Sequence, residues 1–340
     1  MGAFFAIPPG SPGLRNGDTL TATTLTALKA AQRALLLKPL DAAVFLAPYG
    51  TQAPLGGFTD AGGNLQTLPA GFQSVGLIDK KTGIAFSRGI TAAPIESYGE
   101  LQAVRNDITS DITAIEFEAQ QNATALNLQL TTSATLNAMT PNSTNGEVWF
   151  AQPSAENITY YSAIVIGKDG NDSLPTYVIK VMPKVAVSKF GGEQWVPTGV
   201  MSQKLTMVAF KDDVAGFAVA HSYAGPGWAK VVAASGMPYV VTALNITSPT
   251  GPQTLTKGSN QSFQLVVVDQ FKGVVPSSML TYTAGTGLSG AVNISSTGVV
   301  TPTATGGSGT ISIAFNPPVT TPAWPPATAS AAITNTITVQ

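Results

Sequence analysis

Residues 71–130 read GFQSVGLIDKKTGIAFSRGITAAPIESYGELQAVRNDITSDITAIEFEAQQNATALNLQL. Short apolar runs are separated there by Gly, Asp and Asn, which is the pattern of strands joined by tight turns. The clearest strand covers 111–119, because apolar and polar side chains alternate with the period of two that a half-buried strand requires. The stretch closes with a helix-prone segment. The stretch as a whole therefore predicts a mainly β fold.

Five signals follow one another in this stretch. They are VGLI (75–78), GIAFSR (83–88), ESYG (96–99), RNDITSD (105–111) and the alternating strand 112–119. In this order they resemble the core of the major tail (tail tube) protein of long-tailed bacteriophages. The resemblance implies a β-barrel or sandwich domain with one flanking helix, which gives antiparallel strands to a continuous barrel around a channel.

The same resemblance implies a structural virion protein without enzymatic activity or cofactors. Its partners would be other copies of the chain in stacked, commonly hexameric rings, together with the tape measure protein and other tail proteins. DNA would pass through the tube during infection without specific binding. The protein would be made in the host bacterial cytoplasm and reside in the phage tail.

The composition agrees with a surface that contacts other copies. Charged residues make up 10% of the chain, against roughly 25% in typical globular proteins. A net charge of −1 without a basic cluster gives no electrostatic reason for tight nucleic-acid binding. The chain has no cysteine, so it has neither disulfides nor a thiolate metal site. Its first residues lack the pattern of a secretory signal, and we expect a soluble chain until assembly.

Within a first domain, 1–238, the sequence predicts an extended Pro-rich arm at 1–18 and a helix at about 19–37. A short buried strand at 44–46 precedes a Gly- and Pro-rich loop at 47–74. Such length is uncommon in a loop that has no function, so we expect this loop and the Pro-rich segment 1–18 to contact neighbouring rings.

Two hairpins are expected further along the first domain. The first joins 160–167 to 176–188 through the turn KDGN at 168–171, and the second joins 205–210 to 214–221 through KDD at 211–213.

The composition changes near 225–240, and the sequence predicts a second domain at 239–340. Short strands recur there at 240–246, 262–269, 280–283, 299–302, 310–315 and 333–339, as in a small β-sandwich. The pattern resembles bacterial immunoglobulin-like (Ig-like) modules, most clearly in STGVVTP at 296–302. Tyr282 stands where that family often has Trp, and the Pro-rich insert 316–327 is longer than usual. An uncharged Ser/Thr surface fits either weak multivalent contact with host surface polysaccharide or passive decoration.

Few residues are candidates for chemistry. His221 is the sole histidine and ends a predicted strand without an acidic neighbour in sequence, so we expect a structural or interfacial role. Glu116 and Glu118 project to one face of their strand. Paired carboxylates can serve glycoside hydrolysis, but an ordinary solvated face explains them better, and in a tube we expect them to face the lumen and repel DNA. No catalytic, cofactor or metal residue is predicted.

Asp169-Gly170-Asn171-Asp172-Ser173 superficially resembles a calcium loop. Leu174 stands where such a loop needs its glycine, and Lys180 where it needs its bidentate Glu, so the sequence favours a plain turn. A cell-surface adhesin or surface-layer protein built on the Ig-like module is the alternative function. It would explain the Thr-rich C-terminal region but neither the missing secretory signal nor the order of the five signals.

Overall fold

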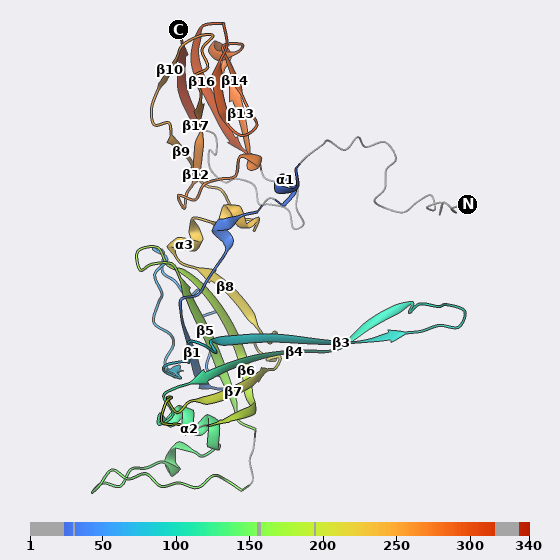
Figure 1. Cartoon of the computed structure of the whole chain (residues 1–340), viewed down its shortest axis with the longest axis vertical. Coiled ribbons are helices and arrows are strands. Elements are labelled where there is room, and N and C mark those ends of the chain that lie inside the picture. The colour runs from blue at the N-terminus through green and yellow to red at the C-terminus, as the bar shows by residue number, and fades with distance from the viewer. Residues whose placement is uncertain (1–23, 30, 155–157, 194, 317–332) are drawn as a thin grey trace. The chain divides into compact units, whose positions relative to one another are not determined.

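The computed structural model describes residues 24–29, 31–154, 158–193, 195–316 and 333–340 (Figure 1). Two compact units divide the chain, Met1–Leu36 and Leu37–Gln340. Strands dominate the described residues, so the prediction of a mainly β protein is confirmed. The Pro-rich segment 1–18, predicted to be extended, lies outside the described residues. So do all residues of the insert 316–327 except the first.

The predicted helix at about 19–37 is wrong in length within the described residues. Only α1 (Leu25–Lys29) is α-helical there, followed by the 3₁₀ turn η1 (Arg33–Leu35). Leu25 and Leu28, two of the apolar residues on which the helix prediction rests, are both 68% exposed. A helix this short draws its stability mainly from packing of its apolar face, and these exposed side chains supply little of it.

The second unit begins with an eight-stranded antiparallel sheet in the order β2-β1-β5-β6-β7-β4-β3, with β8 beside β6. Its strands are β1 (Asp41–Pro48), β2 (Gln73–Ser74), β3 (Ile84–Ile95), β4 (Arg105–Ala119), β5 (Tyr160–Asp169), β6 (Thr176–Glu193), β7 (Gln203–Ala209) and β8 (Ala220–Ala224). The path ends at β2 and β3, so these strands form an open sheet and not a closed barrel.

One of the two predicted hairpins forms. β5 and β6 pair along their length through the turn that follows Asp169, as expected. The expected hairpin of 205–210 with 214–221 is wrong. Both edges of β7 are occupied, by β4 and β6, so β8 pairs instead with the first half of β6.

The main core lies on one face of this sheet. Val44 of β1, Phe117 of β4 and Met182 of β6 belong to one buried cluster, although β1 and β4 are separated by three strands in the sheet. The sheet therefore curls around its own core, and β3 and β4 cross in front of β5 and β6 (Figure 1). The predicted alternation in 111–119 is confirmed, with buried Ile115 and Phe117 facing this core.

The helix-prone segment that closes 71–130 forms α2 (Ala125–Thr132). Thr124 caps its first turn by accepting a hydrogen bond from the amide of Asn127, and Ser133 ends it in the left-handed conformation. Leu126 and Leu130, four residues apart, pack into the core of the curled sheet. The 3₁₀ turn η2 (Leu136–Ala138) follows.

The loop 47–74 covers the other face of the sheet over β1, β5 and β6. Phe58 is 5% exposed and packs with Leu68 and Phe72 against Ile164 and Ile179. These side chains have a role within their own chain, because they shield an apolar face of the sheet from water. Contact of the loop with another ring stays a prediction.

Both faces of the β5–β6 hairpin are consequently buried over much of its length. Ala163 and Val165 face the main core, whereas Ile164 and Ile166 face the loop. Residues 160–167 and the first part of 176–188 are therefore covered on both faces by other parts of the chain over much of their length.

After β8 the chain forms α3 (Pro226–Ala229) and the 3₁₀ turn η3 (Val232–Ser235), and then a set of small sheets. Four strands order as β10-β17-β16-β13, three as β11-β15-β14, and β12 pairs with β9. They are β9 (Leu244–Ser248), β10 (Gln253–Leu255), β11 (Phe263–Gln264), β12 (Val266–Asp269), β13 (Leu280–Ala284), β14 (Val292–Ile294), β15 (Val299–Pro302), β16 (Gly307–Phe315) and β17 (Ile333–Val339), with 3₁₀ turns η4 (Ser277–Met279) and η5 (Thr286–Leu288).

All six strands predicted in this region are present, in agreement with a β-sandwich, whereas β10 and β14 were not predicted. Its buried cluster, which includes Leu265, Ile311 and Ile337, shares no residue with the clusters of the eight-stranded sheet. Tyr282 is partly buried and packs against this cluster. The division of the chain at 238/239 into independently folding domains stays a prediction.

Candidate functional site

A long two-stranded arm extends from the eight-stranded sheet. β3 and β4 pair from Ile84–Phe117 to Ile95–Arg105, but β4 pairs with β7 only over Thr113–Ala119. Residues 89–112, here called the arm, therefore consist of two strands and a connecting loop that project from the sheet (Figure 1). Frequent Ile and Thr favour the extended conformation of both strands.

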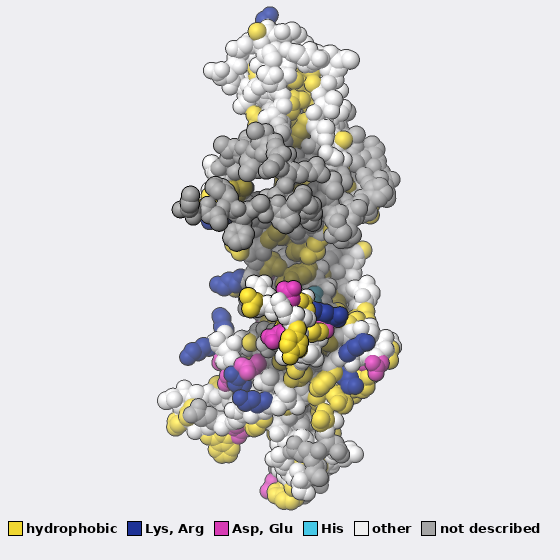
Figure 2. Space-filling model, turned by 90° about the vertical axis from the view of Figure 1, so that its right-hand side faces the viewer, with side chains coloured by type: hydrophobic (Ala, Val, Ile, Leu, Met, Phe, Trp, Pro, Cys, Tyr) yellow, Lys and Arg dark blue, Asp and Glu magenta, His cyan; other side chains and the backbone are white. Residues whose placement is uncertain are grey.

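The arm exposes apolar side chains that a monomer gains nothing by exposing. Ile90 is 52% exposed, Ile108 is 67% exposed, and Tyr98 and Leu101 are fully exposed. Figure 2 views the molecule from the side toward which the arm points, and hydrophobic side chains gather there beside acidic and basic ones. An exposed apolar group of this extent marks an interaction surface.

A turn at the tip of the arm explains the exposure of Tyr98. The amide of Glu100 donates to the carbonyl of Ser97 over 3.2 Å, and Gly99 has a φ of +87°. This is the hydrogen bond and the left-handed third residue of a tight turn, a residue for which glycine is favoured. Tyr98 occupies the second position of the turn and projects away from the strands.

The arm also leaves backbone groups without strand partners. β3 is the last strand of its sheet, and β4 has no neighbour but β3 before Thr113 among the described strands. Unpaired strand edges are templates for pairing with another chain. The arm thus combines unpaired strand edges with exposed apolar side chains.

A groove of about 420 Å³ lies where the arm joins the sheet. This groove, here called the Lys180 groove, is lined by Phe86, Ser87, Arg88, Asp111, Thr113, Lys180, Ala218, Val219 and His221. Its apolar wall packs on the main core, since Phe86, Ala218 and Val219 contact that cluster. A second hollow of about 500 Å³ shares Phe86 and Lys180 with it.

Basic groups dominate the Lys180 groove. Arg88 donates two hydrogen bonds to Asp111, of 2.8 and 2.5 Å, and so neutralises the groove's one carboxylate. Lys180 lies 3.7 Å from the centre of the Phe86 ring and forms no ion pair with any described residue. Burial lowers the pKa of Lys180, because its ammonium loses water without gaining a carboxylate.

His221 lies directly across from Lys180 in the pairing of β8 with β6. Partial burial lowers its pKa, and the charge of Lys180 lowers it further. The structure thus places the sole histidine at the rim of a basic groove. Its interfacial role stays a prediction.

Glu116 and Glu118 share the face of β4 opposite the main core, as their spacing predicts. Lys204 of β7 forms an ion pair of 2.7 Å with Glu116, and Thr206 donates to the same carboxylate. The Lys204 hydrogen bond is the main cause of the lowered pKa of Glu116. Glu118 accepts hydrogen bonds from Thr82 and Ser202.

This face is therefore more balanced in charge than the carboxylate pair alone indicates. Whether Glu116 and Glu118 face a lumen stays a prediction.

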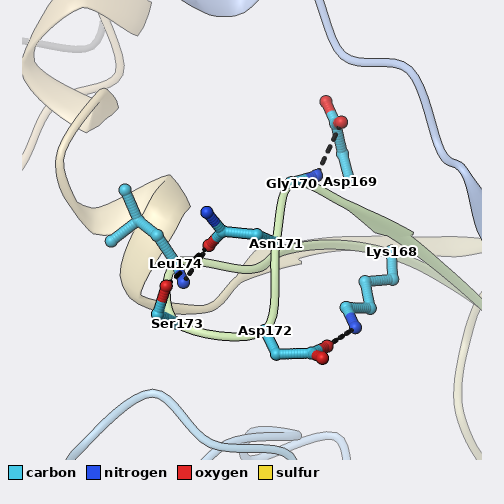
Figure 3. Close-up of polar contacts among 7 residues, drawn as sticks. All are labelled: Lys168, Asp169, Gly170, Asn171, Asp172, Ser173 and Leu174. Atoms are coloured by element: carbon cyan, nitrogen blue, oxygen red, sulfur yellow. Dashed lines mark hydrogen bonds and ion pairs between the residues drawn. The ribbon is translucent and has the colours of Figure 1, made fainter.

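The loop that resembles a calcium site is a turn in the structure (Figure 3). Asp169 accepts from the amide of Gly170, whereas Asp172 points elsewhere and pairs with Lys168. Asn171 accepts from the amide of Leu174 over 2.9 Å and so fixes the backbone. The carboxylates of Asp169 and Asp172 therefore bind groups of the turn and its flanking strand, and they do not converge on a common point.

Within the described ranges, no group of three His, Cys, Asp or Glu side chains converges on a point that could hold a metal ion. No helix in the part of the chain that the structure describes has the length and apolar character needed to cross a membrane.

Sequence reasoning missed the arm and the groove as sites. The available signal was the apolar residues of 89–104, which favour strands but do not show that these strands project from the sheet. Protein-family models give no match to the chain, and the curated proteins give none either.

Proposed function

We propose that this chain is a structural subunit that polymerises into stacked rings and forms the tail tube of a bacteriophage, through which DNA passes. The single observation that carries the proposal is the arm, a projecting hairpin with unpaired edges and exposed apolar side chains. Such an element gains stability only by contact with another molecule. The five sequence signals in 75–119 support the same proposal, because two of them, ESYG at 96–99 and RNDITSD at 105–111, lie in the arm.

An open, curled sheet supports the ring. Its terminal strands β2 and β3 leave edges that a neighbouring subunit can cover, and closure by rotational symmetry removes such edges from every subunit at once. The polar face that carries Glu116 and Glu118 is then available to line a channel, and its Lys204 is paired with Glu116 and so less free to hold phosphates.

Purified protein tests the proposal directly. We expect hollow rings or tubes by negative-stain electron microscopy, and a rise in mass with concentration by light scattering. A chain that remains monomeric at high concentration and is absent from phage particles would contradict the proposal. A folded monomer that binds cell surfaces would favour the adhesin alternative instead.

A matched pair of variants links assembly to the arm. Ile108→Ser and Tyr98→Ser remove exposed apolar groups from the arm, whereas Val214→Ser removes one, 87% exposed, from a turn elsewhere. We expect the two arm variants to raise the concentration needed for assembly, and the turn variant to leave it unchanged. Circular dichroism and thermal unfolding show that all three are folded.

A further inference from the structure

The Lys180 groove presents an unsatisfied positive charge beside an apolar wall. Lys180 has no ion pair within the described chain, and the carboxylate of Asp111 is already bound by Arg88. The neighbouring hollow of about 500 Å³ also contains the carboxylates of Asp41 and Asp79, but neither forms an ion pair with Lys180. Asp79 instead accepts hydrogen bonds of 2.8–2.9 Å from amides of its own turn. A ligand with one carboxylate and an apolar group matches the groove best.

The tip of the arm has this chemistry. Glu96 and Glu100 are exposed on either side of Tyr98, and no described residue forms an ion pair with them. Tyr98 and Leu101 supply the apolar groups. The tip and the groove are therefore complementary in charge and in polarity.

A tip cannot reach the groove of its own chain. The groove begins at Phe86, and β3 runs from there to Ile95 before the loop of the tip. Nine residues of strand at about 3.3 Å each hold the two about 30 Å apart. The straight course of β3 and β4 in Figure 1 keeps this separation.

We propose that the arm tip of one copy docks in the Lys180 groove of a second copy. A tip carboxylate, from Glu96 or Glu100, pairs with Lys180, and Tyr98 packs against Phe86. The contact joins different surfaces of identical chains, so each copy offers both a tip and a free groove and the contact propagates from copy to copy. This inference deepens the proposed function and depends on it for its role in assembly.

Charge reversal with rescue tests the pairing. We expect Lys180→Glu, and separately the double variant Glu96→Lys with Glu100→Lys, to raise the assembly concentration at least about tenfold. Combining all three changes restores opposite charges and should recover most of the assembly. Lys180→Met, which keeps the apolar stem on Phe86, should weaken assembly without unfolding the chain. Full assembly of both charge-reversed proteins, or no recovery in the combination, would overturn the pairing.

Cross-linking tests the geometry independently of charge, and the cysteine-free chain makes it clean. A Leu101→Cys protein mixed with a Thr113→Cys protein should form a disulfide-linked dimer under mild oxidation. Leu101→Cys mixed with Asn260→Cys, an exposed position in the C-terminal sandwich, is the control and should not. Equal cross-linking in both mixtures, or none in the first, overturns the docking.

The outcomes separate this inference from the proposed function. If the protein forms tubes and every tip and groove variant still assembles, the docking inference is contradicted and the proposed tube function is retained. If the wild-type chain forms no rings but the cysteine variants still give the specific tip–groove cross-link, the proposed tube function is contradicted and the docking inference is retained. Binding of free acetate or phosphate at Lys180 without any cross-link would identify the groove as a small-anion site and overturn the docking.

Discussion

Two glycines in the second unit share a positive φ but differ in their surroundings. Gly225 has a φ of +98° and Gly216 a φ of +81°. A Cβ at Gly225 would lie 2.4 Å from the carbonyl oxygen of Pro175, whereas a Cβ at Gly216 would have nothing within 4 Å. The pair separates backbone strain from steric overlap.

We expect Gly216→Ala to lower the free energy of unfolding by about 1–2 kcal/mol, because the left-handed conformation disfavours a Cβ. Gly225→Ala should cost about 1–3 kcal/mol more, since the carbonyl it meets belongs to backbone that cannot rotate away. Urea denaturation measures both. Equal losses would show that the chain before α3 relaxes around the added methyl group.

At the same scale, Glu118 tests the polar face of β4. Glu118→Lys should make assembled protein bind DNA in a salt-dependent manner, because each new phosphate contact releases counterions on binding. Glu147→Lys carries the same charge change in an exposed loop and is the control. Filter binding across a salt series measures the slope. Indistinguishable slopes for the two variants would place Glu118 away from any DNA path.

Among the elements, the loop 47–74 has a role within the fold that its sequence did not predict. Its length and Gly content predicted a contact with other subunits, yet its aromatic side chains cover the β5–β6 face. A fixed loop of this kind acts as a layer of the fold, and its side chains contribute to stability as core residues do.

Phe58→Ala should therefore lower the free energy of unfolding by about 3–5 kcal/mol. Leu55→Ala is the control in the same loop, since Leu55 is 56% exposed, and we expect a change within about 0.5 kcal/mol. Chemical denaturation measures stability, and limited proteolysis reports opening of the loop. A negligible effect of Phe58→Ala would mean that the loop is dispensable to the sheet and available to partners after all.

On the scale of the whole molecule, the separate cores predict separable functions. The buried cluster of the C-terminal sandwich draws only on residues after 240, and those of the eight-stranded sheet only on residues before 220. Truncation after Pro238 should leave a folded chain that still assembles, because the arm and the Lys180 groove both lie in the retained part. The tube should be narrower in electron micrographs.

The complementary fragment 239–340, expressed alone, should unfold cooperatively. If the truncated chain folds but does not assemble, the sandwich forms part of the tube wall and the predicted division of labour is wrong. Glycan binding by the fragment would support contact with polysaccharide, whereas passive decoration predicts none.

The sequence by itself determined most of the strands, but not β10, β14 or the bounds of β8. Alternation in 111–119, turn residues after Asp169 and the spacing of apolar runs after 239 are local patterns, and local patterns fix which segments extend and which face is apolar. Glu116 and Glu118 were placed on one face for the same reason. The closing segment of 71–130 was predicted to be helix-prone, and it forms α2 with a cap at Thr124.

Only the tertiary structure decided which strands are neighbours and which surfaces stay uncovered. The partner of β8 depended on β7 already having two neighbours, and the role of 47–74 depended on an apolar face formed by distant strands. The arm is exposed because β7 stops pairing with β4 at Thr113. Lys180 lacks a carboxylate because Asp111 is held by Arg88. These are non-local outcomes of competition for edges and partners, and a pattern read along one segment cannot contain them.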